Sequence, residues 1–275
     1  MFQIKKILFP VDFSPRCRGA IGYVEAMAGK FDAEVILLNV VEPPAGGVPL
    51  QEMHEPAPES FDRFLGLGRK LLRVDREIAY GEAGAEIVGF AHARAVDLIM
   101  LPTKGLGTFR RLILGSTAAK VLHDADCPVW TGVHMETAPR MDAVSTQRIL
   151  CAVDLQPASG QVLDWARHMA DEYQAELALL HVLPGMTPGY MQPEQEADLR
   201  ASIQKLIDEL QARVGSQATV LIEGGDPAKL VSATAEQWGA DLLVIGRRAE
   251  PGIMGRLAAR AYSIIQQSPC PVVSV

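Results

Sequence analysis

Glycine and hydroxyl residues that could hold a phosphate chain stand close together in the first half of the sequence. Gly105 is followed, after nine residues, by Gly115, Ser116 and Thr117. A glycine lets the backbone approach a ligand where a side chain would collide. A helix that begins at Ser116 would present unpaired N–H groups and the positive end of its dipole, with hydroxyls as further donors. These residues predict a phosphate site, although Gly115 and Ser116 are equally compatible with a plain helix cap.

Further groups could complete such a site. Asp12 directly follows an apolar run and could accept hydrogen bonds from a base amino group or a ribose hydroxyl, or could simply shape the turn before a helix. The backbone at Val40 ends a second apolar run, and Thr103 follows a third. Lys104 and the pair at 110–111 could add positive charge nearby, although the pair is more simply a solvated loop.

Alternating strands and helices would position these residues. The continuous apolar run at 6–11 is typical of a strand buried on both faces, and Ser14 followed by Pro15 predicts the start of a helix. Strands connected by helices predict right-handed parallel crossovers and an open doubly wound sheet, with ligands at the carboxyl ends of the strands. We expect strands at 6–11, 34–41, 74–79, 97–101 and 129–133, and helices at 14–30, 59–72, 83–94 and 116–123.

The same pattern occurs twice. The segments 7–12, 33–40, 97–101 and 127–129 recur, in the same order, at 149–154, 175–182, 241–245 and 270–272. Chance apolar similarity would not keep both the order and the spacing, so the sequence predicts a duplicated domain. We place the domains at 1–138 and 147–275, joined by a polar linker at 134–146.

The segments 7–14, 38–41, 97–105, 115–116 and 127–129 together resemble the universal stress protein family. The resemblance covers nearly the whole chain, twice. It implies an α/β fold of two tandem open five-stranded parallel-sheet domains with helices on both faces, similar to the adenine-nucleotide α-hydrolases and packed as a pseudo-dimer. It also implies ATP, with Mg²⁺, as a ligand of part of the family.

The resemblance assigns roles to the residues of the first domain. Asp12 would lie near the adenine or ribose, and Val40 would meet the base through its backbone. The residues that would hold ribose and phosphates are Thr103, Gly105, Gly115, Ser116 and Thr117. Pro102 stands where the family motif has its first glycine. Proline has a fixed φ and no N–H, so a site that needs either an N–H or a positive φ there would be weakened.

The second domain departs further from the motif. Gly246 keeps the first glycine, but Ala249 replaces the second, and Ala258 and Ala259 stand where the first domain has Gly115 and Ser116. Asp154 repeats Asp12. We therefore predict that the second domain does not bind ATP in the manner of the family and mainly packs against the first.

Composition and charge argue against several classes of function. A net charge of −7 argues against nucleic acid as a partner, and no apolar run is long enough to span a bilayer or to act as a signal peptide. We expect a cytoplasmic protein whose four cysteines are reduced thiols. The histidines lack metal-ligand spacing.

Three functions are compatible with these features of the sequence to different degrees. The favoured one is a stress-response regulator that binds ATP or a related adenine nucleotide in the first domain, with at most slow ATP hydrolysis. The alternative is a universal stress protein that binds no nucleotide and acts as a protein-interaction module, as a pseudo-dimer or a further homodimer. An adenylyl-transferring enzyme is least supported, because no His-x-Gly-His-like signature follows the first strand.

Overall fold

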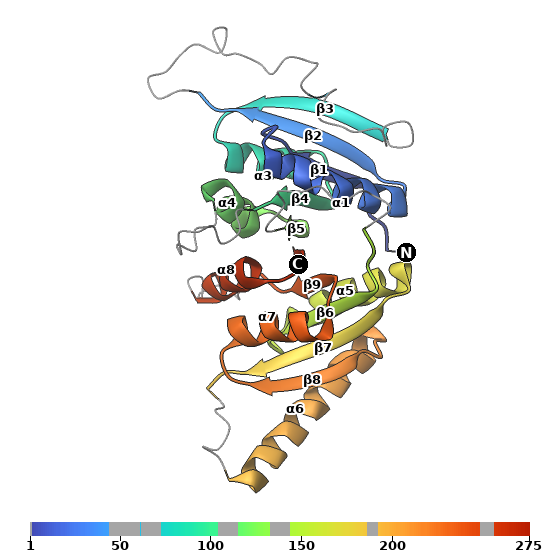
Figure 1. Ribbon diagram of the computed structural model, residues 1–275, viewed down its shortest axis with the longest axis vertical. Helices are drawn as coiled ribbons and strands as arrows, with labels where there is room; N and C mark the ends of the chain where they lie inside the picture. Colours follow the sequence, from blue (N-terminus) through green and yellow to red (C-terminus); the bar gives the residue numbers. More distant parts are fainter. Residues whose placement is uncertain are drawn as a thin grey trace. The chain divides into compact units, whose positions relative to one another are not determined.

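The computed structural model describes residues 2–43, 61, 73–103, 115–132, 144–185, 192–247 and 256–275. The chain divides into two compact units, Met1–Ser145 and Thr146–Val275. Each unit is an open parallel sheet flanked by helices, which confirms the expected fold class (Figure 1). Several predicted features lie outside the described residues: Lys104, Gly105, the pair at 110–111, Ala249 and, apart from Phe61, the helix expected at 59–72.

The first unit has the strand order β3-β2-β1-β4-β5, so β1 and β4 are central and every pairing is parallel. The apolar run that predicted a buried strand forms β1, and it is covered on both faces as expected. The elements are β1 (Lys6–Pro10), α1 (Pro15–Phe31), β2 (Glu34–Val41), β3 (Arg73–Tyr80), α3 (Ala83–Ala93), β4 (Leu98–Pro102), α4 (Ser116–Asp124) and β5 (Val129–Gly132).

The second unit repeats this order, as β8-β7-β6-β9-β10, again with parallel pairing. The strand order reverses between β6 and β9, as it does between β1 and β4 in the first unit. The elements are β6 (Arg148–Val153), α5 (Ser159–Tyr173), β7 (Glu176–Leu183), α6 (Pro193–Val214), β8 (Thr219–Gly224), α7 (Pro227–Trp238), β9 (Leu242–Ile245), α8 (Arg256–Gln267) and β10 (Val272–Ser274).

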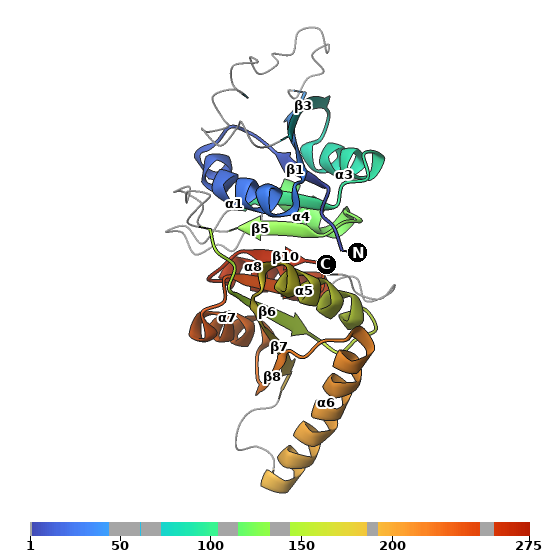
Figure 2. The ribbon, with the colours of Figure 1, turned by 90° about the vertical axis from the view of Figure 1, so that its right-hand side faces the viewer.

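Helices cover both faces of each sheet. In the first unit α1 and α3 lie on opposite faces (Figure 2), and α3 packs against α4. In the second unit α5 packs with α6 on one face, and α7 packs with α8 on the other (Figure 2). The strands of each sheet are parallel, so their carboxyl ends lie along one edge of the sheet, between the two helical layers. Open α/β sheets bind ligands just outside this edge.

The start of α1 confirms the signal read from the sequence. Ser14 is the N-cap and its hydroxyl accepts a hydrogen bond from the Cys17 N–H, while Pro15 occupies the first turn. The start of α7 is built in the same way from Asp226, whose carboxylate accepts from the Lys229 N–H. Local chemistry thus defines where these helices begin.

An aspartate at the amino end of each sheet ties two strands together. Oδ2 of Asp97 accepts from the backbone N–H groups of Lys5 and Lys6, at 2.8 and 2.9 Å. In the second unit, Oδ2 of Asp241 accepts from Gln147 and Arg148, at 2.8 and 3.0 Å. The repeat of this aspartate in the sequence therefore reflects strand register and not ligand binding.

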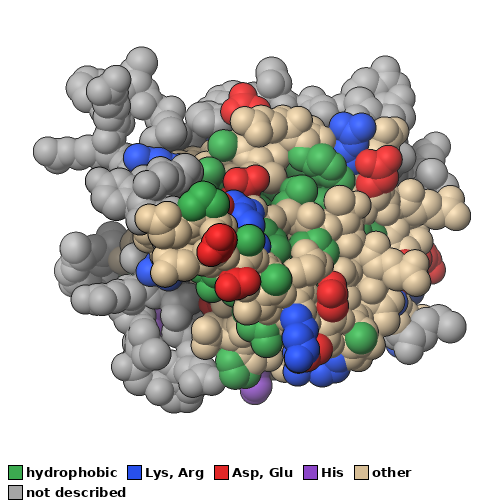
Figure 3. Space-filling model, turned by 90° about the horizontal axis from the view of Figure 1, so that it is seen from below, with side chains coloured by type: hydrophobic (Ala, Val, Ile, Leu, Met, Phe, Trp, Pro, Cys, Tyr) green, Lys and Arg blue, Asp and Glu red, His purple; other side chains and the backbone are tan. Residues whose placement is uncertain are grey.

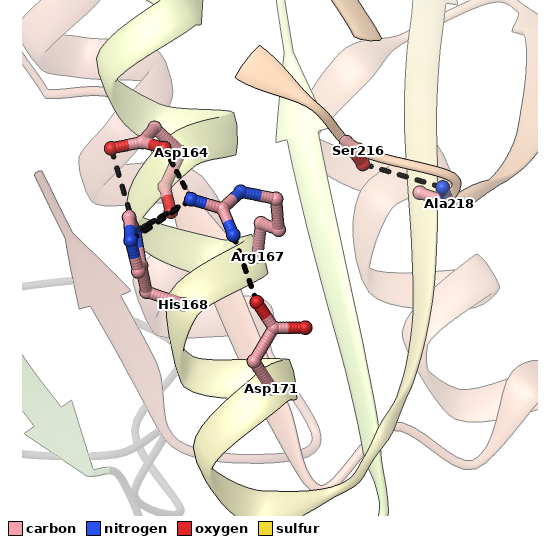
Figure 4. A network of polar contacts seen from close by, with 6 residues as sticks. All are labelled: Asp164, Arg167, His168, Asp171, Ser216 and Ala218. Carbon is pink, nitrogen blue, oxygen red and sulfur yellow. Dashed lines mark hydrogen bonds and ion pairs between the residues drawn. The ribbon is translucent and has the colours of Figure 1, made fainter. Parts of the chain in front are cut away.

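A network of charged side chains lies along α5 (Figure 4). The guanidinium of Arg167 lies 3.0 Å from Asp164 Oδ1 and 2.8 Å from Asp171 Oδ2, and His168 Nε2 lies 2.9 Å from the same guanidinium. The ion-pair partners are three and four residues apart, the spacing at which helical neighbours meet. The network thus adds to the stability of α5 through contacts between successive turns of the helix.

Candidate functional site

Asp12 is held in place directly after β1. Phe13 adopts a positive φ of 57°, and Oδ1 of Asp12 accepts from the Ser14 N–H at 2.9 Å and from the Cys17 thiol at 2.9 Å. These two bonds both reach Oδ1 of the exposed carboxylate, and the side chain of Ser14 is a further hydrogen-bond partner of the group. Burial raises the pKa of Asp12, but the hydrogen bonds from Cys17 and Ser14 outweigh it, so the pKa lies below its usual value. The group is an anionic acceptor at the carboxyl edge of the sheet.

The second unit repeats this arrangement almost atom for atom. Leu155 has a φ of 60°, and Oδ1 of Asp154 accepts from the Gln156 N–H and the Ser159 hydroxyl, both at 3.0 Å. Ser159 thus takes the place of Cys17. The residue after each aspartate has the left-handed conformation, which is uncommon outside glycine and is found where local geometry demands it.

A polar side chain on the second strand of each unit fixes the backbone just before the aspartate. Asn39 donates from Nδ2 to the Val11 carbonyl at 2.7 Å. His181 occupies the same place in β7, with Nδ1 2.9 Å from the Val153 carbonyl. Sequence analysis did not single out either residue. The signal was present, because a hydrogen-bonding side chain recurs at the same place in both copies of an otherwise apolar strand.

Val40 lies beyond the stretch of β2 that pairs with β1. That pairing runs from Lys6 with Glu34 to Pro10 with Leu38, and β2 continues to Val41 alongside β3. Val40 therefore stands at the open carboxyl edge of the sheet. Its contact with a base remains a prediction.

Thr103 and Pro102 are engaged with β5. The N–H of Thr103 donates to the Gly132 carbonyl at 2.9 Å, and its hydroxyl lies 3.4 Å from the same oxygen, so the buried residue is oriented by the protein itself. Pro102 pairs with Gly132 at the end of β4. Its counterpart Gly246 is not among the described glycines with a positive φ. Proline thus fits this backbone, and what it removes is an N–H.

The start of α4 has a glycine as its N-cap residue. Gly115, with φ −58° and ψ 148°, has no side chain that could accept from the first N–H groups. A Cβ built at Gly115 would meet no described residue within 4 Å, so nothing in the described part of the chain closes the approach to this helix end. Ser116 is exposed and Thr117 is half-buried at the same turn. The expected helix start is confirmed, whereas its role in ligand binding stays a prediction.

The second unit contains a cavity of about 760 Å³ at the matching edge. It lies at the carboxyl ends of β6, β7 and β9 and at the start of α8, and its polar lining includes Asp154, His181 and Arg260. A cavity of this size is typical of small-molecule sites. Sequence analysis assigned no ligand to this unit and did not consider Arg260.

Within the described part of the chain, no group of three or more His, Cys, Asp and Glu side chains is arranged to hold a metal ion. None of the described helices is long and apolar enough to cross a membrane.

Two repeated parallel-sheet units, each with an aspartate held after its first strand, define a tandem α/β protein. The model of the universal stress protein family matches residues 3–131 and again residues 145–275. The chain therefore belongs to the universal stress protein family, as its motifs indicated.

One relative matches this chain over nearly the full length of both proteins, and solved structures are similar to all or half of it. A universal stress protein of Mycolicibacterium smegmatis is 26% identical over an alignment of 291 positions, gaps included, which covers 98% of this chain and 96% of that protein. The crystal structure of a universal stress protein from Archaeoglobus fulgidus has a TM-score of 0.70 at 22% identity and covers 99% of this chain and 96% of its own. A further universal stress protein, described in complex with cAMP, covers 48% of this chain and 97% of its own at 20% identity, with a TM-score of 0.40.

Proposed function

We propose that the protein binds an adenine nucleotide, ATP with Mg²⁺, at the carboxyl edge of the first unit, and that occupancy of this site regulates its part in a stress response. The observation that carries the proposal is the start of α4. Its N-cap residue, Gly115, has no side chain to cap the first N–H groups, and no described residue lies within 4 Å of a Cβ built there. Such a helix start favours the negative charge of a phosphate group.

Asp12 supplies the second point of attachment. Its carboxylate is exposed, and Oδ1 is held by Ser14 and Cys17. A carboxylate fixed in this way can accept from a base amino group or a ribose hydroxyl without reorganising. With Val40 at the open edge of β2 and the hydroxyls of Ser116 and Thr117 on α4, the groups available match the two ends of a nucleotide.

The residues of the site are proposed to bind and orient the nucleotide. Gly105 and Thr103 line the ribose and phosphates in this proposal. Because the N–H and the hydroxyl of Thr103 both donate to the Gly132 carbonyl, Thr103 acts as an acceptor through its hydroxyl oxygen. No carboxylate or imidazole other than Asp12 is placed for acid–base chemistry among the proposed binding residues. We therefore propose a nucleotide-binding regulator, with at most slow ATP hydrolysis.

Ligand-induced thermal stabilisation tests this proposal. Wild-type protein should rise in Tm with increasing Mg–ATP, because a ligand that binds only the folded state stabilises it. The double variant Ser116→Ala, Thr117→Val keeps the helix but removes both hydroxyls, and should need roughly tenfold more ATP for the same rise. No rise at millimolar ATP in the wild type would overturn the proposal. An unchanged response in the double variant would show that the phosphates do not bind at the start of α4.

One observation favours the alternative, a protein-interaction module. The 22-residue helix α6 buries only Ile207 and Leu210, and Leu206 is 50% exposed on it. Figure 3 shows hydrophobic side chains interspersed with acidic and basic ones on the face of the molecule seen from below. A protein partner or a second copy of the chain could use such a surface. Absence of any nucleotide response, together with loss of self-association in Leu206→Glu, would favour this function.

A further inference from the structure

The strand at the outer edge of the second unit turns part of its backbone away from the sheet. β8 is the last strand in the order of this sheet, and its neighbour is β7 (Figure 1). The N–H of Gly225 donates to the Leu183 carbonyl at 3.0 Å, so every second residue of β8, counted back from Gly225, bonds β7. The N–H and carbonyl groups of Val220 and Ile222 therefore face away from β7. A row of such groups can pair with another strand.

The corresponding strand of the first unit carries many charges, whereas β8 carries few. The charged residues of β3 are Arg73, Asp75, Arg76 and Glu77, and Arg94 of α3 lies 2.8 Å from Asp75 and 3.0 Å from Glu77. Charged side chains are a common means of keeping an edge strand from pairing. β8 has one acidic residue and no basic residue among its six, so this means of protection is largely missing from the strand itself.

An arginine of α6 protects the edge of β8 instead. Arg200 donates from Nη1 to the outward carbonyl of Ile222 at 2.7 Å, and its Nε donates to Glu196 one turn earlier on the helix, at 3.0 Å. Among the described residues, no other hydrogen bond reaches the outward groups of Val220 and Ile222. The guanidinium thus occupies one acceptor of the edge and places a charge where a further strand would have to lie.

The half of α6 that carries Arg200 is only lightly attached. The two buried residues of the helix, Ile207 and Leu210, both lie in its second half, and residues 193–206 are exposed or half-buried throughout. Among the described residues, the contact from Arg200 to Ile222 is the one hydrogen bond that joins this first half to β8. The edge is therefore closed by a contact that a single substitution removes.

We propose that β8 is a strand-pairing edge closed by Arg200, and that its partner, once Arg200 is withdrawn, is β8 of a second copy of the chain. A strand can pair with its own copy when antiparallel pairing about a twofold axis brings no like charges together. In every such register that pairs Val220 or Ile222 with either residue of the second copy, the single charged residue, Glu223, never lies opposite its own copy. The inference rests on β8 and α6 and does not depend on the nucleotide site proposed for the first unit.

Sedimentation velocity of the full chain tests the proposal. Arg200→Ala should form a reversible species of twice the wild-type mass at roughly 10–100 µM, because one short pair of strands supports only weak association. Lys205→Ala is the matched control: it removes a positive charge from an exposed position of the same helix and should sediment as the wild type does. Sedimentation of Arg200→Ala that equals that of the wild type, or equal association of both variants, would overturn the proposal.

A second substitution distinguishes association through β8 from association through α6. In the Arg200→Ala background, Val220→Pro removes an outward N–H that β7 does not use, and proline is tolerated at such positions of an edge strand. Val220→Lys, made in the same background, returns a charge to the edge and leaves the backbone unchanged. Each double variant that urea unfolding shows to be folded should return to the wild-type mass. Association that persists in a folded double variant would place the contact elsewhere and contradict the proposal.

Discussion

The thiol of Cys17 donates a 2.9 Å hydrogen bond to Oδ1 of Asp12, and the hydroxyl of Ser159 makes the same contact with Asp154 in the second unit. Burial, reinforced by the charge of Asp12, raises the pKa of the Cys17 thiol to about 12. The thiol is therefore a protonated donor at neutral pH. A cysteine that sequence analysis treated only as a reduced thiol thus positions the carboxylate of the candidate site.

Replacement of the Cys17 thiol should be tolerated when the new side chain can still donate a hydrogen bond to Asp12. Cys17→Ser copies Ser159 and should keep the contact with Asp12, whereas Cys17→Ala removes it. We expect the alanine variant to be about 1 kcal/mol less stable than the serine variant in urea unfolding. Equal stability of the two would show that the contact does not hold the turn.

Reactivity of the cysteines should follow burial and pKa. Cys17, Cys151 and Cys270 are buried, and burial raises the pKa of each thiol, whereas Cys127 is half-buried. We expect Ellman's reagent at pH 8 to modify Cys127 first and the other three only on unfolding, because the thiolate is the reactive form. Rapid modification of Cys17 in the native protein, tested in a Cys127→Ser variant, would contradict its burial beside Asp12.

Glu25 should make stability depend on pH. It lies on α1, is only 9% exposed, and burial raises the pKa of its carboxyl group. The folded state therefore holds this proton more tightly than the unfolded state, so the contribution of Glu25 is present below the unfolded pKa and is lost as pH rises through the folded pKa. Glu25→Gln should gain Tm relative to wild type between pH 5 and 7 and little at pH 4. A Tm difference that is constant over this range would refute the prediction.

The aspartates that bind the amino ends of β1 and β6 should matter for stability alone. Asp97→Ala and Asp241→Ala each leave two strand N–H groups without their carboxylate, and should cost roughly 1–3 kcal/mol. Glu236→Ala, an exposed acid on α7, is the control and should change stability by less than about 0.5 kcal/mol. Unfolding in urea measures all three, and similar values for Asp97→Ala and the control would contradict the role of the carboxylate.

Local signals in the sequence predicted the elements well. Ser14 and Pro15 predicted the start of α1, and Gly115 followed by Ser116 predicted the start of α4, because caps are decided by a few neighbouring residues. The buried run that forms β1 was equally clear. The internal repeat then predicted that both halves share one topology, which the strand orders of the two units confirm.

Contacts between segments that are far apart in the sequence could not be predicted from such local signals. The bond from Asn39 to Val11 and its counterpart from His181 to Val153 join neighbouring strands. Local spacing does not indicate these bonds, and only comparison of the two copies shows a hydrogen-bonding side chain at the same place in both. The cavity of the second unit is built from residues 152–264, so its existence depends on packing and not on a motif. The sequence analysis did not predict a role for Arg260, because it considered only the loss of Gly115 and Ser116, which Ala258 and Ala259 replace in the second unit.

A calorimetric titration of the full chain with Mg–ATP, in wild type and in Gly115→Asp, tests the central claim most directly. Aspartate is a preferred N-cap residue, so the variant should keep α4 intact while its charge repels phosphate. Gly115→Asn, neutral and of similar size, separates charge from bulk. Binding to the first unit that falls in the order wild type, Gly115→Asn, Gly115→Asp would agree with a nucleotide held at the start of α4. Undiminished ATP binding in Gly115→Asp would contradict it.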